Sequence, residues 1–152
     1  MIRPAAPEDV SVILRFIREL AEYERLADAC VATEELLRDA LFPDLGAPVA
    51  RVLLAEEDGV PVGFALWFPS FSTFLARAGV WLEDLFVVPS ARGRGIGQAL
   101  LDSLAEIAAQ SGGRLEWSVL KWNTPSIEFY ERLGAERMEE WVTYRLETYS
   151  DS

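Results

Sequence analysis

The sequence predicts one mixed α/β (α+β) domain that spans residues 1–152. Its 152 residues fit a single domain with one core. Because 51% of the residues are hydrophobic and 11% are aromatic, a packed core is expected rather than disorder. Apolar residues alternate between helical spacing and strand-like runs, without repeat or linker. The expected order is strand, two helices, three strands, helix, strand, helix and strand.

The first third of the chain is predicted to be mainly helical. Residues 1–3 form a short strand. Pro7, followed by two acidic residues, then opens a helix that continues to about Glu24 on one apolar face. Thr33 begins a second, shorter helix that ends at Pro43.

The middle of the chain is predicted to form the sheet. Val49–Glu56 and Val60–Phe68 form strands joined by a tight turn at Asp58–Gly59. Pro69–Gly79, which is rich in Ser, Thr and Phe, is expected to be an apolar loop. Trp81–Val88 is almost continuously apolar and is therefore expected to be a central strand.

The last third is predicted to alternate between helices and strands. An amphipathic helix begins at Ile96 and ends at Gly112–Gly113. A strand follows over Arg114–Leu120, and Thr124–Pro125 opens another helix. Glu136–Leu146 is expected to be the final strand.

Charge and cysteine content narrow the class of partner. A formal net charge of −11 argues against nucleic acid binding, which needs a basic face. It is compatible with a cationic substrate, although a solubilising surface charge explains it too. Cys30 is the single cysteine, so no internal disulfide forms, which favours a reducing, cytoplasmic setting. The N-terminus has no signal pattern, and no apolar run reaches the ~20 residues that a membrane span needs, so no membrane segment is expected.

The sequence contains no histidine, which limits the available chemistry. Ser-His-Asp and Cys-His catalysis are excluded. A metal would need carboxylates alone, and no acidic cluster has the spacing of a calcium loop, so no metal site is expected. Acid–base chemistry would have to use Asp, Glu, Tyr, Lys or ordered water.

Leu85–Gln98 reads as a strand that passes through a turn into a glycine-rich loop and then a helix. Backbone N–H groups at such a helix start attract phosphate oxygens. Gly93, Gly95 and Gly97 are two residues apart, and Gln98 stands where a dinucleotide-binding fingerprint needs its third glycine. The Gly-Lys-Ser/Thr of a P-loop is also absent. A different pyrophosphate ligand is therefore indicated.

The segment Arg92–Gly97 resembles the R-x-x-G-x-G/A pyrophosphate loop of the GNAT superfamily of acetyl-CoA-dependent N-acetyltransferases. Trp122–Tyr130, followed by Arg132–Ala135, looks like the other half of that family's cofactor site, and Leu82–Val87 also matches. Nearly the whole chain is similar to the diamine (spermidine/spermine-type) acetyltransferase branch.

This resemblance implies a GNAT-type, mostly antiparallel central sheet, flanked by helices and containing a splayed central strand. It implies acetyl-CoA as acetyl donor, no metal, a small cationic amine as acceptor, and a homodimer. Contacts to the cofactor are expected from three segments. They are Leu85, Phe86 and Val87 for the pantetheine arm, Arg92, Gly93, Arg94, Gly95, Ile96 and Gly97 for the pyrophosphate, and Asn123 with Ser126. Helix capping explains Ser126 equally well.

Two residues are expected to be catalytic. Tyr130 lies one helical turn after Ser126, and the resemblance implies that it protonates the sulfur of departing CoA. A core tyrosine is the alternative. Glu83 is placed by the resemblance at the acceptor amine, where it would take a proton through water. This step is needed because a primary amine with a pKa of ~10.4 is almost wholly protonated at neutral pH.

The acceptor is expected to contact Tyr23, Glu24, Glu83, Asp84 and Trp117. Neighbouring residues on a strand face opposite ways, so Glu83 and Asp84 share a pocket only where a bulge intervenes. Asp84 would bind a second positive charge or satisfy backbone groups. Glu24 at a solvated helix end, and Trp117 as an ordinary core aromatic, are the alternatives.

The acceptor itself stays open between several amines. Ser72–Thr73, and Val142 before Tyr144, stand where polyamine-specific relatives tend to carry acidic residues. A short diamine or a lysine-like or thialysine-like amino acid is therefore favoured at least as much as spermidine. Two other functions compete. A protein N-terminal acetyltransferase would need an open groove, whereas the apolar loop is expected to cover the acceptor site. A non-enzymatic acyl-CoA-binding regulatory module would need neither Glu83 nor Tyr130.

Overall fold

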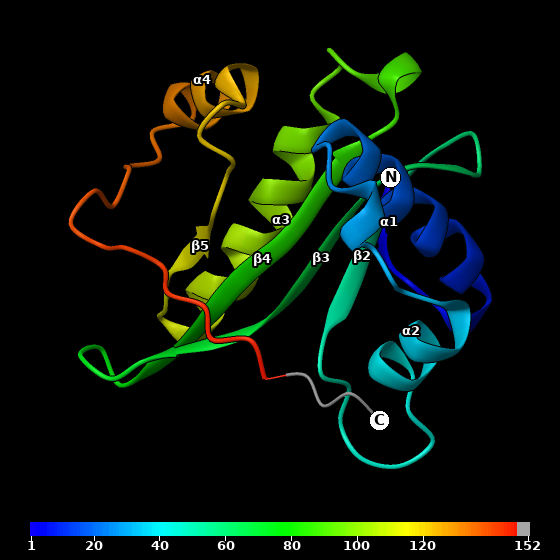
Figure 1. Cartoon of the computed structure of the whole chain (residues 1–152), viewed down its shortest axis with the longest axis horizontal. Helices are drawn as coiled ribbons and strands as arrows, with labels where there is room; N and C mark the ends of the chain where they lie inside the picture. The colour runs from blue at the N-terminus through cyan, green and yellow to red at the C-terminus, as the bar shows by residue number, and fades with distance from the viewer. Residues whose placement is uncertain (149–152) are drawn as a thin grey trace. The chain divides into compact units, whose positions relative to one another are not determined.

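The computed structural model describes residues 1–148, which form two compact units, Met1–Ser118 and Val119 onward (Figure 1). The first unit holds the sheet and three α-helices; the second holds one α-helix. The elements are β1 (Ile2–Pro4), α1 (Val10–Tyr23), α2 (Glu34–Leu41), β2 (Arg51–Glu57), β3 (Val60–Ser72), β4 (Arg77–Val87), α3 (Ile96–Ser111), β5 (Leu115–Trp117) and α4 (Thr124–Arg132). Short 3-10 helices occupy Pro7–Asp9, Ala27–Ala29 and Pro89–Ala91.

The five strands form one sheet in chain order, β1 to β5. β1 to β4 pair antiparallel, and β5 pairs parallel to β4. The predicted mixed, mostly antiparallel sheet flanked by helices is therefore confirmed. Helix starts also follow the sequence, since the Thr33 hydroxyl accepts a hydrogen bond from the Leu36 N–H at 3.2 Å.

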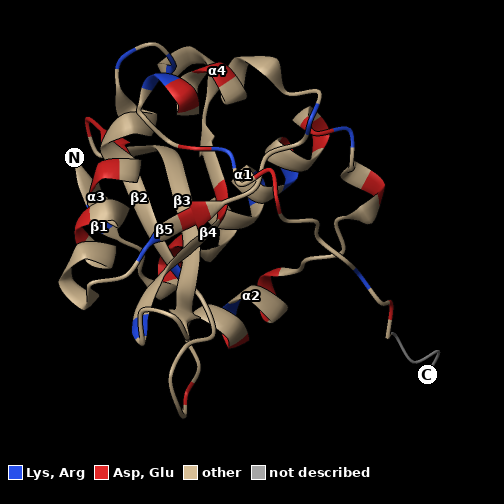
Figure 2. Cartoon of the chain, turned by 90° about the vertical axis from the view of Figure 1, so that its left-hand side faces the viewer, with Lys and Arg blue, Asp and Glu red and all other residues tan. Residues whose placement is uncertain are grey.

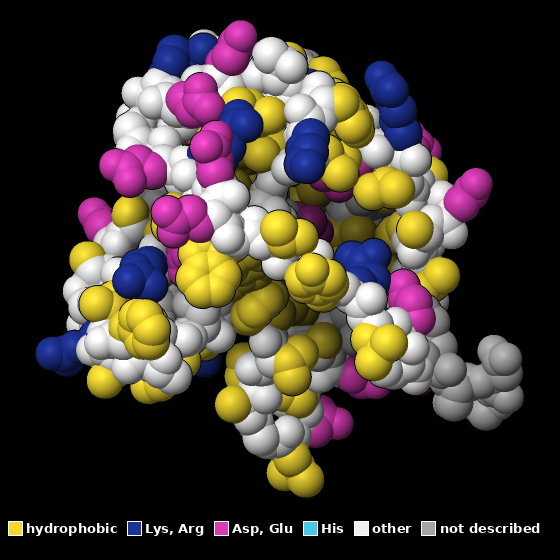
Figure 3. Space-filling model, turned by 60° about the vertical axis from the view of Figure 1, so that its left-hand side comes forward, with side chains coloured by type: hydrophobic (Ala, Val, Ile, Leu, Met, Phe, Trp, Pro, Cys, Tyr) yellow, Lys and Arg dark blue, Asp and Glu magenta, His cyan; other side chains and the backbone are white. Residues whose placement is uncertain are grey.

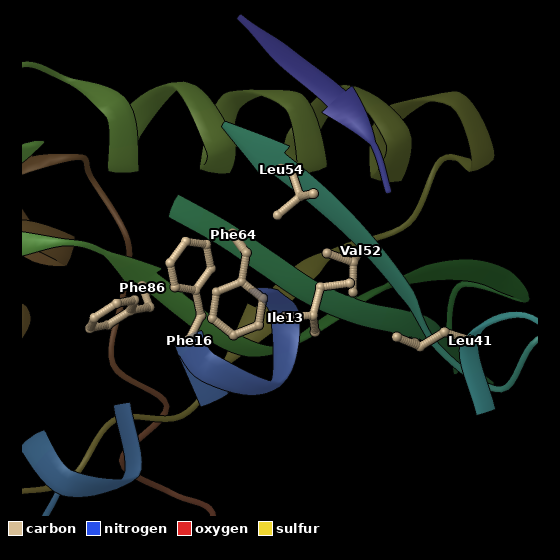
Figure 4. Packing of buried hydrophobic residues seen from close by; sticks show 7 residues of the cluster. All are labelled: Ile13, Phe16, Leu41, Val52, Leu54, Phe64 and Phe86. Carbon is tan, nitrogen blue, oxygen red and sulfur yellow. The ribbon is translucent and has the colours of Figure 1, made fainter. Parts of the chain in front are cut away.

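One hydrophobic core cluster of this unit lies between the sheet and helices α1 and α2 (Figure 4). Phe16 of α1 is at its centre, with its ring centroid 5.7 Å from Phe64 and 5.8 Å from Phe86. Helix α3 runs along the opposite side of the strands (Figure 4). The buried residues of the cluster are Ile13, Phe16, Leu41, Val52, Leu54, Phe64 and Phe86. Phe86 thus anchors β4 from within the segment that the sequence assigns to the cofactor.

A charged network ties the N-terminal strand to this core. Arg3 donates through Nε to Glu56 Oε1 at 2.6 Å and through both Nη atoms to the carboxylate of Asp9, at 2.8 and 3.0 Å. Asp9 Oδ2 also accepts from the Ala6 N–H at 2.7 Å. β1, the chain entering α1, and β2 are thereby joined at one guanidinium group.

The predicted loop over Pro69–Gly79 is wrong, because β3 and β4 continue into it as a long hairpin with its turn near residues 73–76. A glycine in a sequence usually indicates the end of a strand, but Gly79 lies within β4 because of how it packs. A Cβ there would lie 2.5 Å from the Arg114 carbonyl oxygen, so only glycine lets the chain before β5 approach. The segment is therefore an arm of the sheet rather than an irregular loop.

The predicted strand over residues 136–146 is also wrong within the part of the chain that the structure describes, where residues 135–148 form no strand. Trp141, Val142 and Tyr144 are exposed there. An alternating apolar pattern forms a strand only when a sheet edge takes up its hydrogen bonds. The predicted strand over residues 114–120 exists but is shorter, as β5.

Large hydrophobic side chains are also exposed elsewhere on the molecule. On the hairpin of β3 and β4, Phe71 and Phe74 are exposed, the latter at 96%. Figure 3 shows one face on which many hydrophobic side chains reach the surface. No helix of the described residues is long and apolar enough to cross a membrane.

Candidate active site

A β-bulge lies at the acidic pair of β4. Leu66 of β3 pairs with Asp84, but the next residue, Trp67, pairs with Leu82. Glu83 is therefore the extra residue, without a partner on β3. A bulge of this kind breaks the strict alternation of side chains, which is the condition under which Glu83 and Asp84 can serve one pocket.

Three carboxylates gather around this bulge. Burial, followed by charge repulsion from the neighbouring Glu83 and then from Glu24 directly after α1, raises the pKa of Asp84 to about 6. Burial, followed by repulsion from Glu83, also raises the pKa of Glu24. The end of α1 and the bulge of β4 thus bring Glu24, Glu83 and Asp84 together, and these three residues are called the acidic cluster below.

Within the described part of the chain, no observed ion pair includes the acidic cluster. Acidic residues are spread over α2, α3 and α4 (Figure 2), so acidic character alone is not distinctive. None of the ion pairs among residues 1–148, however, includes Glu24, Glu83 or Asp84. Among those residues, no three acidic or cysteine side chains are placed to hold a metal ion. An arrangement of mutually repelling carboxylates favours the binding of positive charge.

One edge of β4 is open next to the acidic cluster. β5 pairs with β4 only as far as Trp117 opposite Leu82, whereas β4 continues to Val87. In the described chain no strand covers that edge from Glu83 onward. This early end of the pairing is the splay expected of the central strand.

Hydrogen bonding along β3 and β4 decides which main-chain groups reach the open edge. Bonding alternates in an antiparallel pair. Because the Val88 N–H donates to the Val62 carbonyl at 2.9 Å, Phe86 also turns its main chain toward β3. Leu85 and Val87 turn theirs to the open edge, where an extended ligand can hydrogen-bond.

The glycine loop has the backbone that a phosphate ligand requires. Gly93 and Gly95 both have a φ of +80°, which other residues rarely adopt. A Cβ on either would meet nothing within 4 Å, so the loop's surface is accessible. Gly95 is the N-cap of α3, and no side chain caps that helix. The N–H groups of the first turn, from Ile96 and Gly97 onward, therefore lack intrahelical partners, and these residues fit a pyrophosphate.

The two arginines of this loop are engaged within the protein. Arg92 Nε donates to the Val87 carbonyl at 2.8 Å. Arg94 pairs with Glu57 at the end of β2. The sequence assigns the segment Arg92–Gly97 to the pyrophosphate and predicts neither of these two side-chain contacts.

Residues around the acidic cluster come from α1 and β5. Tyr23 is the last residue of α1 and directly precedes Glu24. Trp117 is half-buried at the end of β5, opposite the residue before the bulge. The structure thus places all five predicted acceptor residues in the unit Met1–Ser118. The bulge was not predicted, although two acids within an apolar strand signal it.

The remaining predicted residues lie in the second unit. Asn123 is buried and caps α4, its Oδ1 accepting from the Ser126 N–H at 3.4 Å. Ser126 and Tyr130 are one turn apart on α4, as predicted. Tyr130 also contacts Phe129, with ring centroids 5.5 Å apart.

The chain is similar to known proteins along almost its full length. A model described as "Acetyltransferase (GNAT) family" matches residues 15–135. A thialysine N-epsilon-acetyltransferase of Bos taurus is 39% identical over 159 aligned residues, which cover 97% of this chain and 92% of that one. An L-ornithine N5-acetyltransferase of Arabidopsis thaliana is 32% identical and covers 95% and 83%. Among solved structures, an integron cassette protein from the V. cholerae mobile metagenome superposes with a TM-score of 0.79, 29% identity and coverage of 97% and 92%.

The chain therefore belongs to the GNAT acetyltransferase family. It is accordingly an enzyme, an acetyl-CoA-dependent N-acetyltransferase that acts on amines. The resemblance deduced from the sequence is confirmed. Similarity to the diamine branch is in keeping with the two relatives, because thialysine and ornithine each carry two amino groups.

Proposed function

We propose that this enzyme acetylates a primary amine of a small cationic acceptor that carries a second positive charge. The observation that carries the proposal is the acidic cluster, since three mutually repelling carboxylates favour a ligand with more than one ammonium group. A short diamine, a polyamine, or a lysine-like or thialysine-like amino acid fulfils this requirement. The names of the relatives favour the amino acid.

The proposed reaction is direct transfer, for which acetyl-CoA supplies the activated acetyl group. Leu85 and Val87 would bind the pantetheine arm through the open edge of β4, and the N–H groups around Gly93–Gly97 would hold the pyrophosphate. Asn123 and Ser126 would complete the cofactor contacts. This assignment places the thioester near the strand that carries the acidic cluster.

Glu83 and Tyr130 would handle the protons. The acceptor ammonium must lose a proton before its nitrogen attacks, and Glu83 would accept that proton through water. The nitrogen then forms the new bond to the acetyl carbon, and the carbon–sulfur bond breaks as the tetrahedral intermediate collapses. Tyr130 would donate its phenolic proton to the leaving sulfur.

A thiol-release assay with a panel of amines tests the proposal. We expect turnover with ornithine, lysine, thialysine, putrescine or spermidine, and turnover at least tenfold lower with monoamines of equal length, because the second charge is lost. Rapid turnover only with N-terminal peptides would favour a protein N-terminal acetyltransferase. Tight acetyl-CoA binding without turnover of any amine would favour a regulatory module.

The role of Tyr130 has its own test. We predict that Tyr130→Phe lowers kcat about 10- to 100-fold, because general acid catalysis typically contributes at least ~10²-fold and water can replace part of it. Affinity for acetyl-CoA, measured by calorimetry, should change little. An unchanged kcat would remove Tyr130 from the mechanism.

The setting of the enzyme is also a proposal. Residues 1–152 would work as one GNAT domain, in a homodimer and in the cytoplasm. The single cysteine and the resemblance to the diamine branch support this picture. Light scattering coupled to gel filtration distinguishes a dimer of about twice 17.0 kDa from a monomer.

A further inference from the structure

The side chain of Arg92 turns back onto the sheet. Its Nε donates to the Val87 carbonyl at 2.8 Å, on the open edge of β4. Its Cζ lies 5.8 Å from the ring centroid of Tyr23 and 5.6 Å from that of Phe86. The guanidinium group therefore contacts the end of α1 and the end of β4, while the backbone of Arg92 belongs to the loop before α3.

These contacts connect the two halves of the proposed site. Tyr23 directly precedes Glu24 of the acidic cluster, so it belongs to the acceptor side. Val87 presents its main chain on the edge proposed for the pantetheine arm, so it belongs to the cofactor side. Phe86 is buried in the core and fixes the platform beneath the guanidinium group.

On the basis of the proposed function, we propose that Arg92 is a positioning residue that holds the acceptor end of α1 against the cofactor edge of β4. An arginine suits this task because its planar group stacks on aromatic rings while Nε donates in the same plane. A lysine keeps the positive charge but has neither the plane nor the second type of contact. The function of Arg92 thus depends on its shape as well as its charge.

Three observations argue against a role for Arg92 that depends on its positive charge alone. The orientation of its side chain is already set by Val87, Tyr23 and Phe86. The pyrophosphate can bind through backbone N–H groups of the glycine loop, which need no arginine side chain. The acidic cluster does not pair with it either, since Arg92 forms no ion pair with the described residues.

The test compares Arg92→Lys with Arg15→Lys. Arg15 is a matched control, because its Cζ lies 5.2 Å from the ring centroid of Phe16, outside the site. We expect Arg92→Lys to lower kcat/KM for the acceptor about tenfold, the effect of losing one stacked, hydrogen-bonded arginine. The dissociation constant for CoA, from calorimetry, should stay within about twofold because the charge remains. Arg15→Lys should change neither quantity.

A second pair of variants separates positioning from general loss of structure. Tyr23→Phe keeps the ring and should retain the coupling to Arg92, whereas Tyr23→Leu removes it. If both residues act through one contact, the double variant Arg92→Lys/Tyr23→Leu is no more impaired than the worse single variant. Multiplicative effects would show that the two residues act independently and would overturn the proposal.

Hydrogen exchange supplies a readout that does not depend on activity. The amides of Glu24 and Leu26 bond to the carbonyls of Leu20 and Ala21 at the end of α1. We expect them to exchange several-fold faster in Arg92→Lys and unchanged in Arg15→Lys. Unchanged exchange, together with a more than tenfold loss of CoA affinity, would make Arg92 a phosphate ligand and overturn the proposal. Faster exchange in an enzyme that acetylates no amine would support positioning and reject the proposed function.

Discussion

The unit Met1–Ser118 contains two groups of acidic residues that behave in opposite ways. Asp9 and Glu56 surround Arg3 near the N-terminus, and hydrogen bonds from this arginine lower the pKa of Asp9. The acidic cluster belongs to none of the ion pairs observed among residues 1–148, and burial with like-charge repulsion raises the pKa of Asp84 to about 6. The residue types are the same, and the difference lies in their partners.

The first group contributes to the fold and the second opposes it. Asp9 stabilises the protein above the pKa of the unfolded carboxyl, and this contribution is lost as the pH falls through its lower folded pKa. Charged Asp84 destabilises the protein above about pH 6, and this cost disappears as protonation proceeds toward the unfolded pKa of 3.8. Acidic residues that cost stability are best explained by a cationic ligand that pairs with them.

Glu83→Gln should show the largest effect in this comparison. The amide cannot accept the proton of the acceptor ammonium, so kcat/KM should fall about 10²- to 10³-fold. Removing one of three like charges should leave the melting temperature unchanged or raise it. Steady-state kinetics and thermal unfolding at pH 7 measure both quantities.

If Glu83 is a functional residue, kcat/KM should fall in Glu83→Gln while the melting temperature does not. A variant that loses activity and stability together would indicate a structural role for the bulge. Wild-type kcat/KM in a well-folded Glu83→Gln enzyme would assign the proton transfer to another group.

Asp9→Asn should have the opposite profile. Asn is neutral and has one acceptor oxygen, so it cannot replace the two charge-assisted hydrogen bonds from Arg3. The free energy of unfolding should therefore fall by about 2 kcal/mol, a typical value for charge-assisted hydrogen bonds. Urea unfolding at pH 7 measures the loss, which should shrink as the pH approaches 3. Since Asp9 lies outside the proposed site, kcat/KM of the folded variant should equal that of wild type. Reduced kcat/KM in a fully folded variant would contradict this division between the two groups.

Most of the first unit was predictable because its signals are local. Thr33 caps its helix, Asp58–Gly59 forms its turn, and Gly95 opens α3. Hydrophobic periodicity together with these caps and turns therefore located the helices and the central strands. The glycine loop was also predictable from local sequence, since the spacing of its glycines allows the backbone conformation at the start of α3.

The features that sequence missed all depend on contacts distant in the chain. Gly79 stays within β4 because Arg114 passes close to it, which no local pattern reveals. The bulge at Glu83 arises from the register with β3, and the contact of Arg92 with Tyr23 bridges about 70 residues. Side-chain direction at the site was thus the least predictable property, because it depends on register and on contacts between distant segments.

Asp84→Asn should give the smallest effect and the most specific one. Removing a half-buried charge that its neighbouring carboxylates disfavour should raise the free energy of unfolding at pH 7 by about 1 kcal/mol, or about 2–4 °C in melting temperature. Loss of one carboxylate should lower kcat/KM for a dicationic acceptor about tenfold, the worth of one charge-assisted contact, and have little effect on a monoamine. In wild type, kcat/KM for the dication should also fall below about pH 6, as Asp84 becomes protonated in the free enzyme. This fall in kcat/KM at acidic pH should be absent from Asp84→Asn. If it persists, the titrating group is Glu24, and Asp84 does not recognise the second charge.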